Sequence, residues 1–165
     1  MKKVLVAYYS QTGNTEKIAQ AIYDALQCEK AIKAIDENCD SMGYELIFCG
    51  FPVQAHSVPS KVRPFLKELT KDQKVAFFTT HGSLRGGNFA RQALEDAFGM
   101  APQTKVIGTF GCRGKVQPKL IDKLAKQLEH EAWVDEAHSA HEHPTDADLH
   151  DAAVFTTEMT KKAQI

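Results

Sequence analysis

The sequence lacks the features that mark several large classes of protein. Its four cysteines in 165 residues include no C-x-x-C pair, so neither a disulfide framework nor a zinc cage is expected. No apolar run approaches the roughly 20 residues that a membrane span needs. The formal net charge of −1 lacks the basic excess of general nucleic-acid binders. These absences predict a cytoplasmic protein that binds neither membranes nor nucleic acid.

Motifs of several common enzymes are missing as well. There is no G-x-x-x-x-G-K-[ST] loop, which argues against a nucleoside triphosphatase, and no G-x-G-x-x-G, which argues against a dinucleotide site. Neither an H-E-x-x-H zinc motif nor a Ser-His-Asp pattern is present, so no catalytic side chain is assigned.

The chain consists instead of short apolar runs that alternate with helical patterns. Runs rich in β-branched and aromatic residues predict strands at Val4–Tyr9, Ala31–Ile35, Glu45–Phe51, Val75–Thr80 and Val106–Cys112. Apolar residues at helical spacing predict helices over Ile18–Leu26, Pro59–Leu69, Phe89–Phe98, Pro118–Leu128 and Asp148–Ala163. The alternation predicts a single α/β domain over residues 1–165, with a doubly wound five-stranded parallel sheet covered by helices on both faces.

The polar segment Ser10–Thr15 separates the first strand from the first helix. In an open parallel sheet, ligands bind at the carboxyl ends of the strands, and a helix start offers unpaired N–H groups and a positive dipole end. Gly13 allows a tight turn, and the hydroxyl and amide side chains add donors, so the segment could hold a phosphate without a lysine. The alternative is an ordinary capped helix start, with Asn14 or Thr15 as N-cap.

The motif S-x-T-G-N-T, placed after V-L-V-A-Y-Y and before an amphipathic helix, resembles the FMN-phosphate loop of the flavodoxin family. The similarity extends over residues 1–128 in the order and spacing of strands and helices. It implies a flavodoxin-like fold with strand order 2-1-3-4-5 and a noncovalently bound FMN. The phosphate binders that it implies are Ser10, Gln11, Thr12, Gly13, Asn14 and Thr15.

In flavodoxins the flavin ring is held by the loops after the third and fourth strands, which here are GFPVQAHSVP and THGSLRGGNFARQ. The resemblance therefore assigns two further groups of residues to the cofactor. From the first loop these are Phe51, Pro52, Val53, Gln54, Ala55 and His56. From the second they are Thr80, His81, Gly82, Ser83, Gly86, Gly87, Asn88 and Phe89. The alternative is that both are ordinary surface loops.

The sequence departs from the electron-carrier flavodoxins at the ring site. Those proteins usually enclose the ring between Trp and Tyr, and neither loop contains either residue. Phe51 and Phe89 could replace them or point into the core, and His56 and His81 are alternative planar groups. The segment Phe51–Ser57 also lacks the glycine at which a peptide flip stabilises half-reduced flavin, and other residues resist such backbone angles. Strong stabilisation of that state is therefore not expected.

Charge is segregated along the second half of the chain. Residues 105–126 contain six basic residues and the single acid Asp122, whereas residues 129–151 contain acids and histidines but no Lys or Arg. Arg85, Arg113 and Lys115 are expected at the carboxyl edge, where a basic rim would attract an acidic protein surface or a small anion. The alternative is ordinary solvated charge.

The histidines His130, His138, His141, His143 and His150 could supply metal ligands, but their polar surroundings favour a connector that leads to the last helix. Trp133 or that helix could cover part of the flavin site or form a dimer contact.

Together these features predict an FMN-binding redox protein that carries electrons between redox partners. One alternative is a small FMN-dependent reductase acting on an anionic or planar substrate. Another is a binding module of the same fold without flavin. A phosphorelay receiver domain would have an acidic pair after the first strand, where this chain has Ser10 and Gln11.

Overall fold

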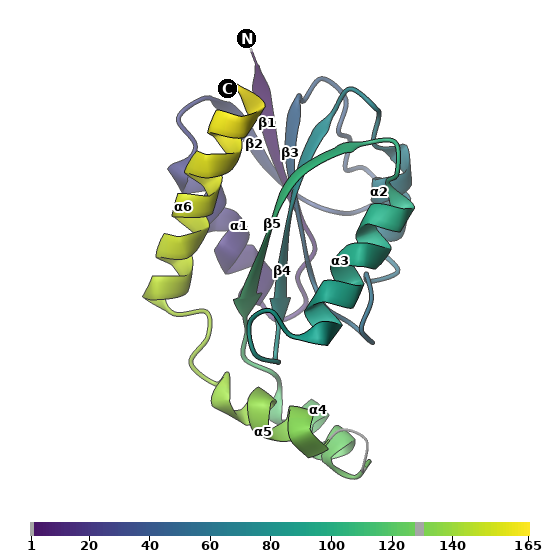
Figure 1. The fold of residues 1–165 in the computed structure, drawn as a ribbon, viewed down its shortest axis with the longest axis vertical. Coiled ribbons are helices and arrows are strands. Elements are labelled where there is room, and N and C mark those ends of the chain that lie inside the picture. The colour runs from purple at the N-terminus through teal and green to yellow at the C-terminus, as the bar shows by residue number, and fades with distance from the viewer. Residues whose placement is uncertain (1, 128–130) are drawn as a thin grey trace.

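One parallel sheet forms the centre of the molecule. The computed structural model describes residues 2–127 and 131–165. The strands within these residues are β1 (Lys3–Tyr8), β2 (Glu29–Ala34), β3 (Leu46–Pro52), β4 (Lys74–His81) and β5 (Lys105–Arg113). They form a five-stranded sheet in the order β2-β1-β3-β4-β5, and every neighbouring pair is parallel (Figure 1). The predicted fold class and strand order are confirmed, and strand ends differ from the sequence prediction by one or two residues.

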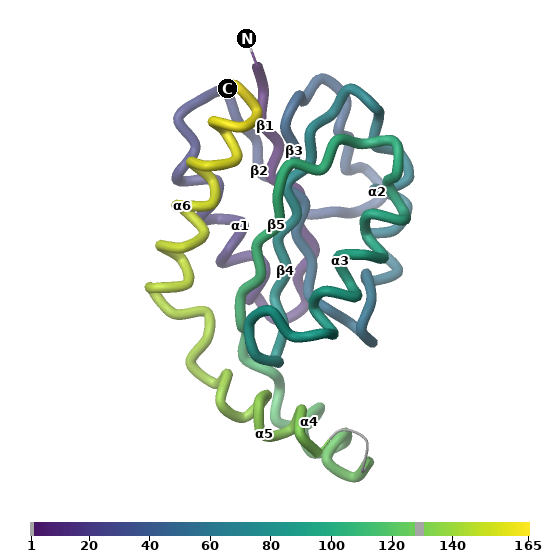
Figure 2. The backbone as a smooth tube through the Cα atoms, viewed as in Figure 1, coloured from purple at the N-terminus to yellow at the C-terminus, as the bar shows by residue number. Residues whose placement is uncertain are grey.

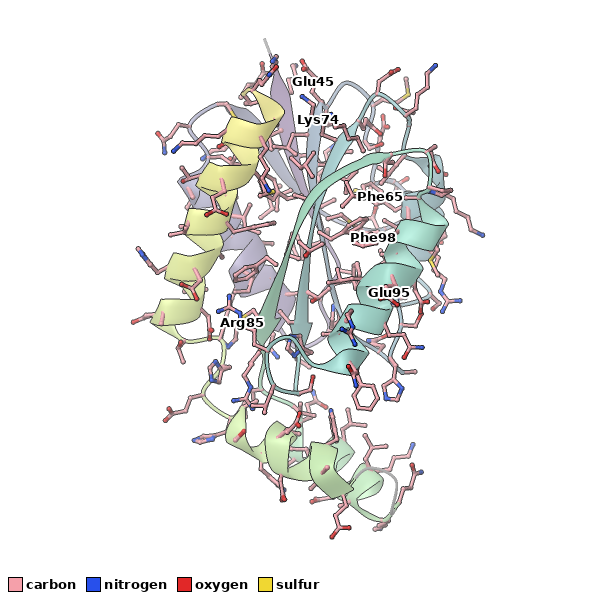
Figure 3. All side chains as sticks on the ribbon, in the orientation of Figure 1. Glu45, Phe65, Lys74, Arg85, Glu95 and Phe98 are labelled. Atoms are coloured by element: carbon pink, nitrogen blue, oxygen red, sulfur yellow. The ribbon has the colours of Figure 1, made fainter. Side chains whose placement is uncertain are left out.

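Helices cover both faces of the sheet. α1 (Asn14–Ala25) and α6 (Asp146–Ala163) lie on one face, and α2 (Arg63–Glu68) and α3 (Asn88–Met100) lie on the other (Figure 1). The central strands are consequently apolar on both sides, and the side chains of β3 from Leu46 to Phe51 are completely buried. Figure 3 shows Phe65 and Phe98 on the α2–α3 face, where the Phe98 ring packs 5.7 Å from that of Phe77. Among the helices of the described residues, none has the length and apolarity that a bilayer crossing requires.

The polar region after β5 forms two helices that extend past the body of the domain. α4 (Pro118–Ala125) and α5 (Glu131–Ser139) lie beyond the carboxyl ends of β4 and β5 (Figures 1 and 2). The segment predicted as a connector to the last helix contains α5, a helix that the sequence pattern did not predict. Ala137 is the buried residue of α5, and Ala140, directly after the helix, is buried as well. The predicted helix end at Leu128 lies outside the described residues, as does His130.

A capping box fixes the start of α6. The Thr145 hydroxyl accepts from the Asp148 backbone N–H, and the Asp148 carboxylate accepts from the Thr145 N–H at 2.7 Å. The same carboxylate contacts His143 Nδ1 at 2.6 Å. Burial raises the pKa of Asp148, but the hydrogen bonds from Thr145 and His143 outweigh it, and the pKa is lowered. The last helix therefore begins at a defined cap, Thr145. No group of three or more possible metal ligands occurs in the part of the chain that the structure describes.

Gly50 is required by the packing of β3 against a buried ring. A Cβ at Gly50 would lie 2.0 Å from Cε2 of Phe78, a side chain with no exposed surface. We expect Gly50→Ala to lower the free energy of unfolding by about 1–3 kcal/mol, because the ring must shift within a close-packed core. Chemical denaturation of the protein without added ligand measures this difference.

Gly99 provides the matched control, because a Cβ there meets nothing within 4 Å and the residue lies in α3. Gly99→Ala should raise stability by up to about 1 kcal/mol. Equal unfolding midpoints for Gly50→Ala and the wild type would contradict the packing argument.

Candidate functional site

The loop before α1 leaves the first turn of that helix without a side-chain cap. Gly13 is the N-cap, with φ of 92° in the left-handed region, and no side chain caps the helix. The Ser10 hydroxyl accepts from the Gly13 N–H at 3.1 Å, and the first intrahelical bond runs from the Lys17 N–H to the Gly13 carbonyl at 3.0 Å. The backbone N–H groups of residues 14–16 therefore precede the helical ladder. The alternative of Asn14 or Thr15 as N-cap is wrong.

Asn14 and Thr15 instead attach the loop to the neighbouring strands. Asn14 Nδ2 donates to the Lys115 carbonyl at 2.9 Å, and the buried Thr15 and Thr80 hydroxyls are 2.8 Å apart. Gly114 allows the first of these contacts, because a Cβ there would lie 2.6 Å from Asn14 Nδ2. These bonds fix the start of α1 relative to β4 and to the segment after β5.

A cavity of about 490 Å³ opens beside this helix start. Eleven of its lining residues belong to the predicted site: Ser10, Gln11, Thr12, Asn14, Thr15, Pro52, Val53, Gln54, Thr80, His81 and Gly82. Lys115, which was predicted for the basic rim, also lines it. Sequence reasoning missed Gly114, Val116, Gln117 and Leu120. Their signal was their position directly after β5, whose carboxyl end lies beside that of β4.

The remaining predicted residues are not among those that line the cavity. They are Gly13, Phe51, Ala55, His56, Ser83, Gly86, Gly87, Asn88 and Phe89. Phe51 as a ring contact is wrong, because its side chain is completely buried against Phe77 in the core. Alternation along β3 turns its side chain to the face of the sheet that α2 and α3 cover.

The loop after β3 contains a tight turn in an unusual conformation. Gln54 and Ser57 exchange two backbone hydrogen bonds, of 3.1 and 2.9 Å, around Ala55 and His56. These two central residues have φ of 46° and 60°, which glycine and asparagine adopt far more readily. The His56 ring stacks on Phe89 with centroids 3.8 Å apart and an interplanar angle of 4°. The loop after β3 therefore contacts the first turn of α3 through two planar side chains.

His81 is a buried, neutral group at the end of β4. Only 6% of its surface is exposed, and Nδ1 lies 3.0 Å from the Ser83 carbonyl. Since a carbonyl oxygen only accepts, this bond favours the tautomer with its proton on Nδ1, which leaves Nε2 as an acceptor; the Ser83 hydroxyl lies 3.2 Å from the same Nδ1. Nε2 has no partner among the described residues. Burial lowers the pKa of His81, and the charges of Arg113 and Arg85 lower it further against the opposing bond from Ser83.

The arginines predicted for a basic rim form bonds with other parts of the protein. Arg85 forms an ion pair with Asp151 on α6 at 2.9 Å and lies at the carboxyl edge, at the opposite end of the sheet from Glu45 and Lys74 (Figure 3). Arg113 donates to the Glu136 carbonyl and the Ser139 hydroxyl of α5, at 2.7 and 2.6 Å. Both arginines therefore hold α5 and α6 in position, and of the three predicted cations only Lys115 lines the cavity.

Comparison with known proteins agrees with this geometry. A family model described as a flavodoxin domain matches residues 5–157. The chain belongs to the flavodoxin family. A curated relative, the flavodoxin-like domain-containing protein BilS of Clostridioides difficile, is 30% identical over 175 residues and covers 99% of both chains.

Two solved structures have the same fold. Oxidised flavodoxin 2 of Bacillus cereus is 17% identical, with a TM-score of 0.64 over 97% of this chain and 99% of that one. A flavoprotein of Lactobacillus acidophilus, solved in complex with FMN, is 21% identical, with a TM-score of 0.56 over 74% of this chain and 98% of that one.

The lowered pKa of His81 should make stability depend on pH. The folded-state pKa lies below the ordinary value of about 6.5, so the unfolded chain binds more protons as the pH falls below that value. Stability contributed by the neutral ring is present above about pH 6.5 and is lost on acidification. We expect the thermal midpoint of the wild type to fall from pH 7.5 to pH 5.5, and that of His81→Asn to fall less.

Asn is chosen because its side-chain N–H can replace Nδ1 as the donor to Ser83. His150→Asn is the control, because His150 is exposed on α6, and its pH profile should match that of the wild type. Parallel profiles for His81→Asn and the wild type would contradict the assignment.

Proposed function

We propose that this protein binds FMN noncovalently and carries electrons between redox partners. The observation that supports this best is the uncapped first turn of α1, which opens on a cavity bounded by the loops after β3 and β4. FMN supplies the redox chemistry when it is bound, and the protein holds it and tunes its potential. No catalytic side chain is required for that role.

The donors around Ser10–Thr15 suit a phosphate group. The positive end of the α1 dipole and the N–H groups of its first turn favour an anion, and the exposed Thr12 hydroxyl can donate to it. Lys115 lines the same cavity and adds positive charge. We infer that the phosphate lies at this end of the cavity.

The other end of the cavity suits a flat, partly apolar ring. Pro52 and Val53 supply apolar surface from β3 and its loop, and the β4 end supplies Thr80 and Gly82. A volume of about 490 Å³ is within the ordinary range for pockets that hold small ligands and cofactors. Because His81 is neutral, the β4 end adds no full charge beside the ring, so we expect backbone and hydroxyl groups to make the polar contacts there.

A reductase that acts on a small substrate is the second candidate. Leu120 and Val116 give the cavity an apolar side on which a planar substrate could rest against the ring. An enzyme of this kind would oxidise NADH or NADPH, or turn over a small acceptor, without another protein. A carrier would do so only with a reductase present. Steady-state assays of the FMN-loaded protein, with and without a general flavodoxin reductase, separate the two functions.

Flavin titration tests the proposed phosphate site. Apoprotein should quench FMN fluorescence with a dissociation constant at or below about 1 µM, and riboflavin, which lacks the phosphate, should bind at least about tenfold more weakly. Thr12→Glu should weaken FMN binding at least about tenfold, because its carboxylate would occupy and repel the phosphate position. It should affect riboflavin much less.

Thr157→Glu is the matched control, since Thr157 is exposed on α6 and the change of charge is identical. This variant should bind FMN like the wild type. Apoprotein that ignores FMN would exclude the proposed function. Equal affinity for FMN and riboflavin would exclude the phosphate site.

A further inference from the structure

α4 carries a stripe of positive charge on one face. Lys119, Lys123 and Lys126 recur at intervals of four and three residues, which places them on the same side of the helix. Lys115 precedes the helix, and all four side chains are exposed. Within residues 2–127 and 131–165, the amino groups of Lys115, Lys119 and Lys123 form no ion pair. Unlike Arg85, which is paired with Asp151, these lysines present unpaired charge to the solvent.

An exposed apolar residue lies beside this stripe at the mouth of the cavity. Leu120 is 46% exposed, follows Lys119 in the helix and lines the cavity wall. Protein interfaces typically combine an apolar centre with a charged or polar rim. Leu120 and the lysine stripe together have this composition.

The position of α4 relative to the sheet makes this surface accessible. The α4–α5 pair extends beyond the carboxyl ends of the strands, at the edge where the cavity opens (Figures 1 and 2). A protein that contacts α4 would therefore lie next to the cavity mouth. This is the geometry that electron transfer to or from a bound flavin needs.

We propose that α4 is the docking surface for an acidic redox protein. Carboxylates of the partner face Lys115, Lys119 and Lys123, and an apolar residue of the partner covers Leu120. The stripe from Lys119 to Lys126 extends over about 10 Å of helix, which matches several carboxylates on a protein better than one small anion. Complementary charge of this kind mainly raises the rate of association. This inference rests on the proposed function, because the electron that passes to the partner comes from bound, reduced FMN.

Electron transfer to proteins of opposite charge tests the docking surface. The FMN-loaded protein is reduced photochemically and mixed in a stopped-flow instrument with an acidic b-type cytochrome or a basic c-type cytochrome. Each ferric haem takes one electron from the reduced flavin. At low salt, Lys119→Glu/Lys123→Glu should slow reduction of the acidic cytochrome about tenfold or more, and it should remove most of the salt dependence of that rate. Reduction of the basic cytochrome should be unchanged or faster.

Lys67→Glu/Lys71→Glu is the matched control, with the same change in net charge. Both lysines are exposed and lie at the end of α2 and in the following turn, near the amino end of β4. This variant should reduce the acidic cytochrome within about twofold of the wild-type rate. An equal slowing by both double variants would mean that only net charge matters, and it would overturn the docking site.

Two further measurements complete the test. FMN titration of both double variants should give dissociation constants within about twofold of the wild type. Failure of the wild type to bind FMN overturns the proposed function itself, whereas normal FMN binding with unchanged electron transfer overturns only the docking surface. Ferricyanide serves as a small anionic acceptor. If its reduction slows as much as that of the acidic cytochrome, the stripe attracts small anions and the protein-docking proposal is wrong.

Discussion

The rest of the site depends on one requirement: the free N–H groups in the first turn of α1 need a hydrogen-bond partner. The glycine at position 13 ends the loop in a left-handed conformation, and no side chain then caps the helix. These donors would be costly to bury without a partner, so the helix start must remain accessible to water or to a ligand. The cavity beside it meets this requirement. The loop before α1 and the walls of the cavity are therefore parts of one arrangement.

Side-chain contacts between distant parts of the chain fix the position of this loop relative to the cavity walls. Asn14 and Thr15 use their side chains to reach the segment after β5 and the end of β4, respectively. A short polar loop would otherwise be mobile, because it has few apolar contacts. Gly114 is needed for the Asn14 contact, since any side chain at this position would displace Asn14. The carboxyl ends of β1, β4 and β5 are thus held at fixed relative positions before any ligand binds.

Sequence reasoning found the sheet because strand signals are local. Buried parallel strands are continuously apolar, and the five predicted runs correspond to β1–β5. It failed where tertiary contacts decide the outcome. Phe51 follows strand alternation into the core, although it stands beside residues that line the cavity. α5 was missed because its one buried residue is Ala137, which gives little apolar signal, and its contact with the end of β4 near Gly82 is tertiary.

The left-handed turn at Ala55 and His56 could not be predicted from the sequence either. Neither residue marks such a turn in a sequence, and only the bonds between Gln54 and Ser57 reveal it. The absence of glycine from this loop suggested a backbone that avoids unusual angles, yet two adjacent residues adopt positive φ. Each such residue costs about 1–2 kcal/mol, so the surrounding contacts, including the His56–Phe89 stack, must offset that cost.

Net charge describes this molecule poorly, because the formal value of −1 conceals how its charges are used. The charge of Arg85 is paired with that of Asp151, whereas Arg113 donates to the neutral Glu136 carbonyl and Ser139 hydroxyl of α5. Lys119 and Lys123 lack carboxylate partners among the described residues and remain exposed. An approaching protein responds to the local potential within about 10 Å at ordinary ionic strength, not to the sum over the chain. A nearly neutral protein can therefore present a basic surface at the one edge where its cavity opens.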